Sequence, residues 1–221
     1  MIIIPLGCSK DANNKVSSIS FKYNNKQDMQ LELKKEKIIY TIEEKVFDTE
    51  FVKIKYPQIS HLKDKIIQDS INEQLQNALK VYEDEANAIK SALEVNYKVT
   101  RESDNILSIL FIGEQSFENG KINIQKGINF DLRTSNQINS SNLIKEDELA
   151  KKEVNELVKN SAKEQGIEDL TELESWLGLY FEEETVVFYF IKENEIEFNE
   201  IRIPYSHIKP YMRGKYGEKP Q

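Results

Sequence analysis

Ser206 and His207 come nearest in this sequence to a catalytic pair, a nucleophile beside a base. Nucleophilic catalysis needs the serine hydroxyl within hydrogen-bond reach of the imidazole, and a third group that orients the ring. Adjacent residues direct their side chains apart, and the sequence indicates no orienting carboxylate. The pattern therefore favours a terminal turn that packs Ile203, Tyr205 and Ile208 against a sheet, or a contact surface that includes Tyr211, over a hydrolase.

The sequence offers still less support for metal or phosphate chemistry. Its two histidines are His61 and His207, and neither has a second histidine or a cysteine at helical or hairpin spacing. A zinc site needs about three or four such ligands, and a calcium loop of the DxDxDG type is missing. No GxxxxGK[ST], GxGxxG or GxSxG motif occurs. We predict a protein without catalytic residues, metal or cofactor.

The charge balance favours a basic partner. Thirty-eight acidic and 30 basic residues give a net charge of -8, so no global positive field attracts nucleic acid or anionic lipid. Glu182, Glu183 and Glu184 form one acidic run, and together with Glu193 and Glu195 they predict an acidic edge that binds a cation or a basic protein. Hydration of a hairpin explains such a run equally well, and both interpretations stand.

Aromatic residues raise the possibility of a sugar-binding surface. Alternation along the predicted strands places most of them in the core, however, and the single tryptophan, Trp176, is expected to be a packing anchor. The residues considered are Tyr97, Tyr180, Phe188, Tyr189 and Phe190. A cell-wall glycan therefore remains the alternative ligand.

Cys8 is the only cysteine, and it follows an apolar run and Gly7. A Gly-Cys-Ser sequence after such a run is typical of the end of a bacterial lipoprotein signal, in which the cysteine is acylated. The basic start is missing, and seven residues are too few for a signal with an apolar segment of about 7–15 residues. Either the true start lies upstream or Cys8 is a small buried thiol at a frayed apolar terminus.

The 221 residues are enough for one or two domains with a true core. Strand patterns occur at 38–42 and 51–56, the latter stopped by Pro57, and Ser60 is expected to cap a long helix that reaches Ala92. Leu62, Ile66, Ile71, Leu75, Ala78, Leu79 and Tyr82 form its predicted apolar stripe. This helix should pack on a sheet.

Three strands should follow as an antiparallel meander, at 93–99, 106–112 and 122–132, with Asn119-Gly120 as a hairpin turn. A second helix is expected from Glu146 to Glu164, with Leu149, Val154, Leu157, Val158 and Ala162 inward and Gly166 at its end. A last meander at 179–181, 185–191 and 196–203 leads into the terminal turn at 204–211. The predicted class is α+β, with two antiparallel-sheet units that each carry a helix on one face.

Several segments together resemble a pair of bacterial extracytoplasmic domains. They are Tyr56-Pro57-Gln58-Ile59, Ile71-Asn72, 105–109, 127–134, Leu143-Ile144, 187–190 and 203–211. The pair is similar to the lysozyme-binding outer part of anti-sigma-V factors and to the non-catalytic N-terminal part of PdaC-type peptidoglycan deacetylases. The resemblance covers about residues 38–212 and departs in one place: the 190–201 loop is short, acidic and without Pro or Gly.

The resemblance implies three segments: a signal remnant and tether at 1–30, a PdaC-like α+β subdomain at 31–135, and an anti-sigma-V-like α+β subdomain at 136–221. It also implies a non-catalytic binding or sensing domain of a cell-envelope lipoprotein, anchored outside the membrane through Cys8. The expected partner is lysozyme or another envelope protein, contacted through Glu193, Glu195, Tyr205, Ser206, His207 and Tyr211. The alternative is a peptidoglycan-binding module, and neither interpretation includes nucleic acid.

Overall fold

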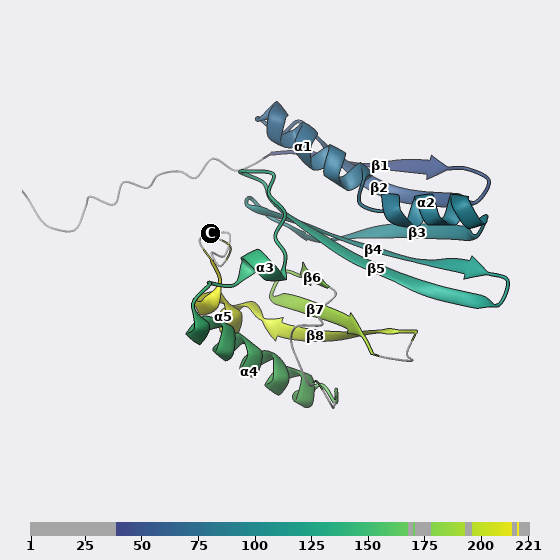
Figure 1. Cartoon of the computed structure of the whole chain (residues 1–221). Coiled ribbons are helices and arrows are strands. Elements are labelled where there is room, and N and C mark those ends of the chain that lie inside the picture. Colours follow the sequence, from purple (N-terminus) through teal and green to yellow (C-terminus); the bar gives the residue numbers. More distant parts are fainter. Residues whose placement is uncertain (1–38, 168–169, 171–177, 193–195, 214–215, 217–221) are drawn as a thin grey trace, which may run out of the picture. The chain divides into compact units, whose positions relative to one another are not determined.

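The computed structural model describes residues 39–167, 170, 178–192, 196–213 and 216, all of which belong to one compact unit spanning 37–221. Two sheets build this unit, one of five strands and one of three (Figure 1). Helices α1 (Lys65–Gln76) and α2 (Lys80–Ile89) cover one face of the larger sheet. The predicted α+β class is confirmed.

The five-stranded sheet has the order β1-β2-β3-β4-β5. Its strands are β1 (Thr41–Asp48), β2 (Val52–Ser60), β3 (Ala92–Glu102), β4 (Ile106–Phe117) and β5 (Gly120–Asp131). The meander β3-β4-β5 is antiparallel, as predicted, and β4 is buried on both faces from Ile106 to Phe111. Phe117 pairs with Gly120, so a two-residue turn of Glu118 and Asn119 joins β4 to β5, one residue before the predicted Asn119-Gly120.

The sheet is mixed, which corrects the prediction of purely antiparallel units. Strand β2 pairs with β3 in parallel, from Val52–Leu93 to Ile54–Val95. Parallel neighbours need a crossover connection, and α1 and α2 supply it. A second correction concerns Pro57, which was predicted to stop this strand. The parallel pairing covers only three residues of β2. The strand runs on through Pro57 to Ser60 because beyond Ile54 it has only β1 beside it, and a residue without an N–H is tolerated at such an edge.

The predicted long helix is two helices. Asp64 caps α1 instead of Ser60, with its carboxylate accepting hydrogen bonds from the Ile66 and Ile67 amides, and a turn at 77–79 separates α1 from α2. The turn buries both Ala78 and Leu79 against the sheet. Ile66, predicted to face inward, is 82% exposed. Ile71 and Leu75 are buried as expected.

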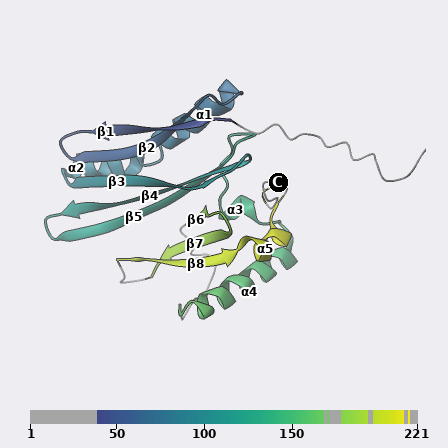
Figure 2. The same ribbon diagram turned by 180° about the vertical axis from the view of Figure 1, so that it is seen from behind.

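The second sheet is antiparallel, in the order β6 (Gly178–Phe181), β7 (Thr185–Ile191) and β8 (Phe198–Pro204). Helix α4 (Glu148–Glu164) packs beside β8 (Figure 2) and is preceded by the short α3 (Ser140–Leu143), which was not predicted. Leu149 is exposed, contrary to prediction, because the buried side of α4 begins at Ala150. Gly166 follows the end of α4 at a φ of 75°, as its predicted role requires.

The chain then enters α5 (Tyr205–Ile208) and the 3-10 turn η2 (Lys209–Tyr211). Ile203, Tyr205 and Ile208 are buried there, which confirms the prediction of a terminal turn packed on the sheet. Tyr205 anchors this turn through its amide, which donates to the Glu184 carbonyl over 2.8 Å.

The two sheets meet through buried hydrogen bonds. The Ser108 hydroxyl accepts from the Phe181 amide over 3.0 Å and donates to Asn129 over 2.7 Å, and Asn129 donates to the Leu179 carbonyl. The Gly127 amide donates to the Tyr189 hydroxyl over 2.7 Å. These bonds satisfy polar groups that burial would otherwise penalise, so they fix how the second sheet lies on β4 and β5.

None of the helices that the structure describes has the length and apolar character needed to cross a bilayer. Cys8, Trp176, Glu193 and Glu195 lie outside the described residues. The tether and the division into 31–135 and 136–221 stay predictions.

Candidate functional site

The predicted contact residues of the terminal turn do not share one surface. Tyr205 is 2% exposed, Tyr211 is half-buried, and Ser206 and His207 are exposed. Tyr205 therefore supports the turn from inside and does not reach a partner. Burial raises the pKa of its phenol, while the nearby Arg101 acts to lower it. The available contact groups of the turn are Ser206 and His207.

Ser206 and His207 make no hydrogen bond to each other in the described part of the chain, and no described carboxylate orients the imidazole. A serine nucleophile needs both contacts. The geometry thus supplies no support for a hydrolase at this turn.

A second group of hydroxyl and imidazole side chains, not singled out from the sequence, joins the start of β1 to the end of β2. The Thr41 and Ser60 hydroxyls lie 2.7 Å apart, both lie within 3.2 Å of His61 Nδ1, and Ser60 donates to Glu43 over 3.1 Å. Hydrogen bonds from Lys45 and Ser60 lower the pKa of Glu43. A carboxylate with a lowered pKa is a poor base, so we interpret the group as a clasp between the two strands.

The acidic run of the second hairpin is partly used inside the molecule. Glu182 accepts from Thr185 over 2.7 Å and lies 3.6 Å from Arg202, which also pairs with Glu200 at 2.6 Å. The Tyr180 hydroxyl donates to Glu200, and burial followed by the charge of Glu200 raises the pKa of Tyr180. These charges hold β6 and β8 together, which weakens the prediction that this run is an open acidic edge.

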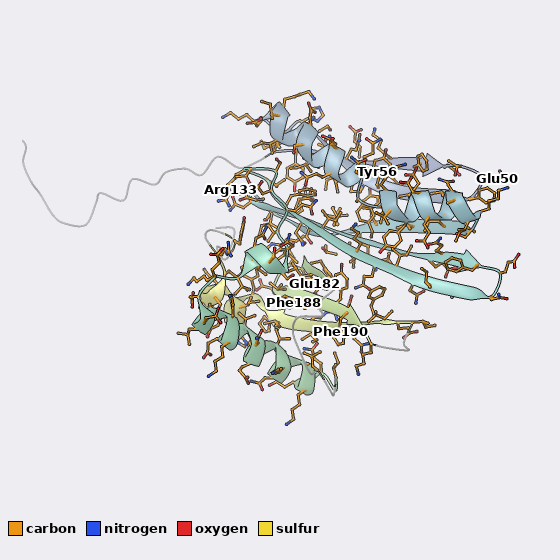
Figure 3. All side chains as sticks on the ribbon, viewed as in Figure 1. Glu50, Tyr56, Arg133, Glu182, Phe188 and Phe190 are labelled. Atoms are coloured by element: carbon orange, nitrogen blue, oxygen red, sulfur yellow. The ribbon has the colours of Figure 1, made fainter. Side chains whose placement is uncertain are left out.

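A different acidic surface lies at the end of the larger sheet where β1 turns into β2. We name it the acidic hollow: a depression of about 320 Å³ with Asp48, Glu50, Glu94, Glu114 and Lys53 among its lining residues. Glu50 lies at the tip of this end in Figure 3. Glu114 pairs with Lys121 at 2.7 Å, whereas Asp48, Glu50 and Glu94 form no ion pair with any described residue.

Strand register creates this concentration of charge. Lys53 lies opposite Asp48 on one side and Glu94 on the other, and Glu94 lies opposite Glu114. Like charges directly opposite each other on neighbouring strands disfavour the sheet. The four carboxylates come from three separate segments between Asp48 and Glu114, so no single run of acidic residues in the sequence indicated them. No group of three or more metal-ligating side chains occurs among the described residues.

Most of the aromatic residues considered for a sugar-binding surface lie in the core, as strand alternation predicted. Tyr180, Phe188 and Tyr189 are at most 3% exposed, while Tyr97 and Phe190 are half-buried. Tyr189 packs edge-on against Phe198 with ring centroids 5.9 Å apart. The described strands therefore offer no row of exposed rings on which a sugar can stack.

A polar depression lies at the other end of the sheet, beyond the end of β5. We name it the arginine pocket; its volume is about 530 Å³, and Asp131, Arg133 and Arg213 contribute to its lining. Arg133 marks its position in Figure 3, at the end of the sheet opposite Glu50. Arg133 holds Asp131 through two hydrogen bonds of 2.8 Å each.

Comparison with known proteins identifies the fold. No protein-family profile matches the sequence, and no curated protein sequence matches it. A DUF3298 family member from Bacteroides fragilis is similar with a TM-score of 0.56 and 13% identity, over 80% of this chain and 94% of that one. A DUF3298 family protein from Pseudomonas aeruginosa gives a TM-score of 0.54 and 12% identity, over 83% of this chain and 97% of that one. The likeness shows a shared fold, and the resemblance to anti-sigma-V factors and PdaC-type enzymes stays a prediction.

Proposed function

We propose that the chain is a non-catalytic binding domain of the cell envelope, anchored outside the membrane by a lipid on Cys8, and that its partner is a basic protein of the lysozyme type. The single observation that carries the proposal is the acidic hollow. Three of its carboxylates, those of Asp48, Glu50 and Glu94, form no ion pair with a described residue.

The charge of these carboxylates favours a positively charged partner. Within the hollow, Lys53 is the one basic lining residue beside four acidic ones, so the hollow itself is negatively charged, as the whole chain is. Such a surface accelerates the encounter with a positively charged protein, and each contact becomes stronger when the interface excludes water. Asp48, Lys53, Glu94 and Glu114 of the hollow lie on paired strands, so binding to them needs little reordering of the backbone.

The chemistry of the hollow favours lysine and arginine side chains over a bound metal ion. Its carboxylates come from β1, the turn after it, β3 and β4, and they form no metal-ligating group of three among the described residues. A protein that presents several separated cations matches this spacing, and phosphate or nucleic acid is repelled.

Calorimetric titration of the full chain with lysozyme tests the proposal, at 20 mM and 150 mM salt as conditions of the experiment. We expect binding that weakens as salt rises, because screening affects exposed charges. Glu50→Gln with Glu94→Gln should weaken binding by about tenfold or more, equivalent to about 1.4 kcal/mol.

A matched control removes the same charge elsewhere. Glu153 and Glu156 are exposed on α4, far from the hollow along the chain, and form no ion pair with a described residue. Glu153→Gln with Glu156→Gln should leave the affinity within about twofold. Equal losses in both double variants would assign the effect to net charge and reject the hollow, and no heat at tens of micromolar protein would reject lysozyme as the partner.

A further inference from the structure

The arginine pocket has the properties of a built ligand site. Its wall comes from four parts of the chain: the end of β5, the loop that follows it, α3 and the segment after η2. The lining includes Asp131, Arg133, Asn136, Gln137, Arg213 and Tyr216. A volume of about 530 Å³ lies within the range of small-molecule sites, about 300–1,000 Å³.

Hydrogen bonds hold the loop of this pocket from several sides. The Asp131 amide donates to the Asn136 carbonyl over 2.9 Å, and the Thr134 and Ser135 amides donate back to the Asp131 carbonyl. From α1, the Gln74 amide group donates to the Ser135 carbonyl and accepts from Gln137. A loop fixed in this way loses little entropy when a ligand binds.

The charges in the pocket are already neutralised. Arg133 contacts both oxygens of Asp131, which is only 5% exposed, and Arg213 donates to Glu146 over 2.6 Å. Two guanidinium groups thus face two carboxylates. An oxyanion would have to compete with these carboxylates, so the pocket favours an uncharged ligand.

Hydrogen-bonding capacity nevertheless remains. The Asn136 side chain forms no hydrogen bond with a described residue, and Gln137 uses its amide nitrogen while its oxygen accepts none. Arg213 uses Nε and Nη2, on the Ile144 carbonyl and Glu146. The pocket therefore presents donors and acceptors side by side, which suits hydroxyl groups because each both donates and accepts.

Tyr216 adds an aromatic ring to the lining of the arginine pocket. It packs against the core of the second sheet, and burial is the main cause that raises the pKa of its phenol. Asp131 raises that pKa further, and Arg133 and Arg213 lower it, so all three charges act on one hydroxyl. An apolar ring beside convergent polar groups is a common composition of small-ligand sites.

We propose that the arginine pocket binds an uncharged saccharide through its hydroxyl groups. This pocket is separate from the acidic hollow, which lies at the opposite end of the sheet, as the positions of Arg133 and Glu50 show (Figure 3). One chain therefore has room for a basic protein and a glycan at separate sites.

The test titrates the ¹⁵N-labelled full chain with the tetrasaccharide of N-acetylglucosamine, up to 10 mM, with inorganic phosphate in a parallel titration. We expect saturable shifts of the Asn136 and Gln137 side-chain amide signals and of Arg133 Nε with the saccharide only. Asn136→Ala should weaken binding by about three- to tenfold, the range expected for a lost hydrogen bond.

Asn136→Ala removes no intramolecular side-chain bond among the described residues, so the variant should fold. The control is Asn160→Ala, at an exposed position of α4, which should bind like the original chain. The proposal is overturned if the saccharide produces no shifts at 10 mM, if the shifts fall outside the pocket, or if Asn136→Ala binds unchanged. Phosphate binding at the same signals would also overturn it, because it would assign the pocket to oxyanions.

Discussion

Arg101 is a buried cation without an ionic partner among the described residues. It is 3% exposed, and its Nε and Nη1 atoms form no hydrogen bond. Its guanidinium carbon lies 4.6 Å from the centre of the Tyr205 ring and 6.0 Å from that of Phe181. The side chain thus joins β3 to α5 by stacking over the Tyr205 ring.

We predict that Arg101→Met keeps or raises the free energy of unfolding. Burial of an unpaired charge costs several kcal/mol, whereas a desolvated cation–π contact returns only about 2 kcal/mol. Methionine fills similar space without the charge. Urea unfolding measures the difference, with Tyr205→Ala as the opposite case, expected to lose about 3–5 kcal/mol through the cavity it leaves. A loss above about 1 kcal/mol in Arg101→Met would contradict this balance.

Individual residues were predictable from the sequence where local chemistry decides their role. Gly166 follows a helix, and Tyr205 and Ile208 alternate with exposed neighbours, so their positions followed from pattern. Asn129 and Ser108 were not predictable as a joint between sheets, because each lies in a strand and its partner in the second sheet is 50 or more residues away.

At the scale of elements, β5 and β6 approach so closely that only glycine fits at position 127. A Cβ there would collide with the Leu179 carbonyl oxygen and come within 3.1 Å of Tyr180 Cβ. The Gly127 amide is also the donor to Tyr189. The contact of the two sheets therefore depends on a missing side chain.

We expect Gly127→Ala to destabilise the protein by about 2–4 kcal/mol, because backbone must move to relieve the collision. The comparison is Gly166→Ala, where open space surrounds the position and only the φ of 75° is unfavourable, at a cost of about 1–2 kcal/mol. Thermal or urea unfolding measures both. If Gly127→Ala lost no more free energy of unfolding than Gly166→Ala, the two sheets would be able to move apart easily.

Most elements followed from periodicity, and the exceptions have a common physical cause. The meander β3-β4-β5 has local pairing, so alternation and one turn signal were enough. The parallel pairing of β2 with β3 depends on where the chain joins the sheet after α1 and α2. No local sequence pattern specifies that position. The acidic hollow depends on this pairing, and the arginine pocket depends on the return of the chain after η2 to α3, where the Arg213 amide donates to the Leu143 carbonyl, so neither was predicted.

For the whole molecule, buried tyrosines determine how stability responds to alkali. Burial raises the pKa of Tyr189 to about 12, and it raises those of Tyr40 and Tyr180 as well. In the unfolded chain a tyrosine has a pKa of about 10. Below that pH both states hold the proton, and above it the unfolded chain releases the proton first, so the unfolded state becomes favoured.

We therefore predict that the free energy of unfolding falls above pH of about 10, by about 1.4 kcal/mol per pH unit for each such tyrosine until its folded pKa is passed. Urea unfolding between pH 8 and 11 measures the slope. Tyr189→Phe should have a lower stability at pH 8, since the Gly127 amide loses its acceptor, and a shallower slope by one tyrosine. An unchanged slope would mean that Tyr189 is not the group that titrates.

The joint between the sheets also imposes an order of events during synthesis. Ser108 binds Phe181, which is 73 residues later, and Gly127 binds Tyr189, which is 62 residues later. The last strand of the five-stranded sheet ends at Asp131. During synthesis, the face of this sheet that β6 and β7 later cover therefore stays exposed, including Ser108, Asn129 and Leu110, until β7 leaves the ribosome. For that interval the nascent chain carries an open sheet face, and a chaperone has its clearest opportunity to bind there.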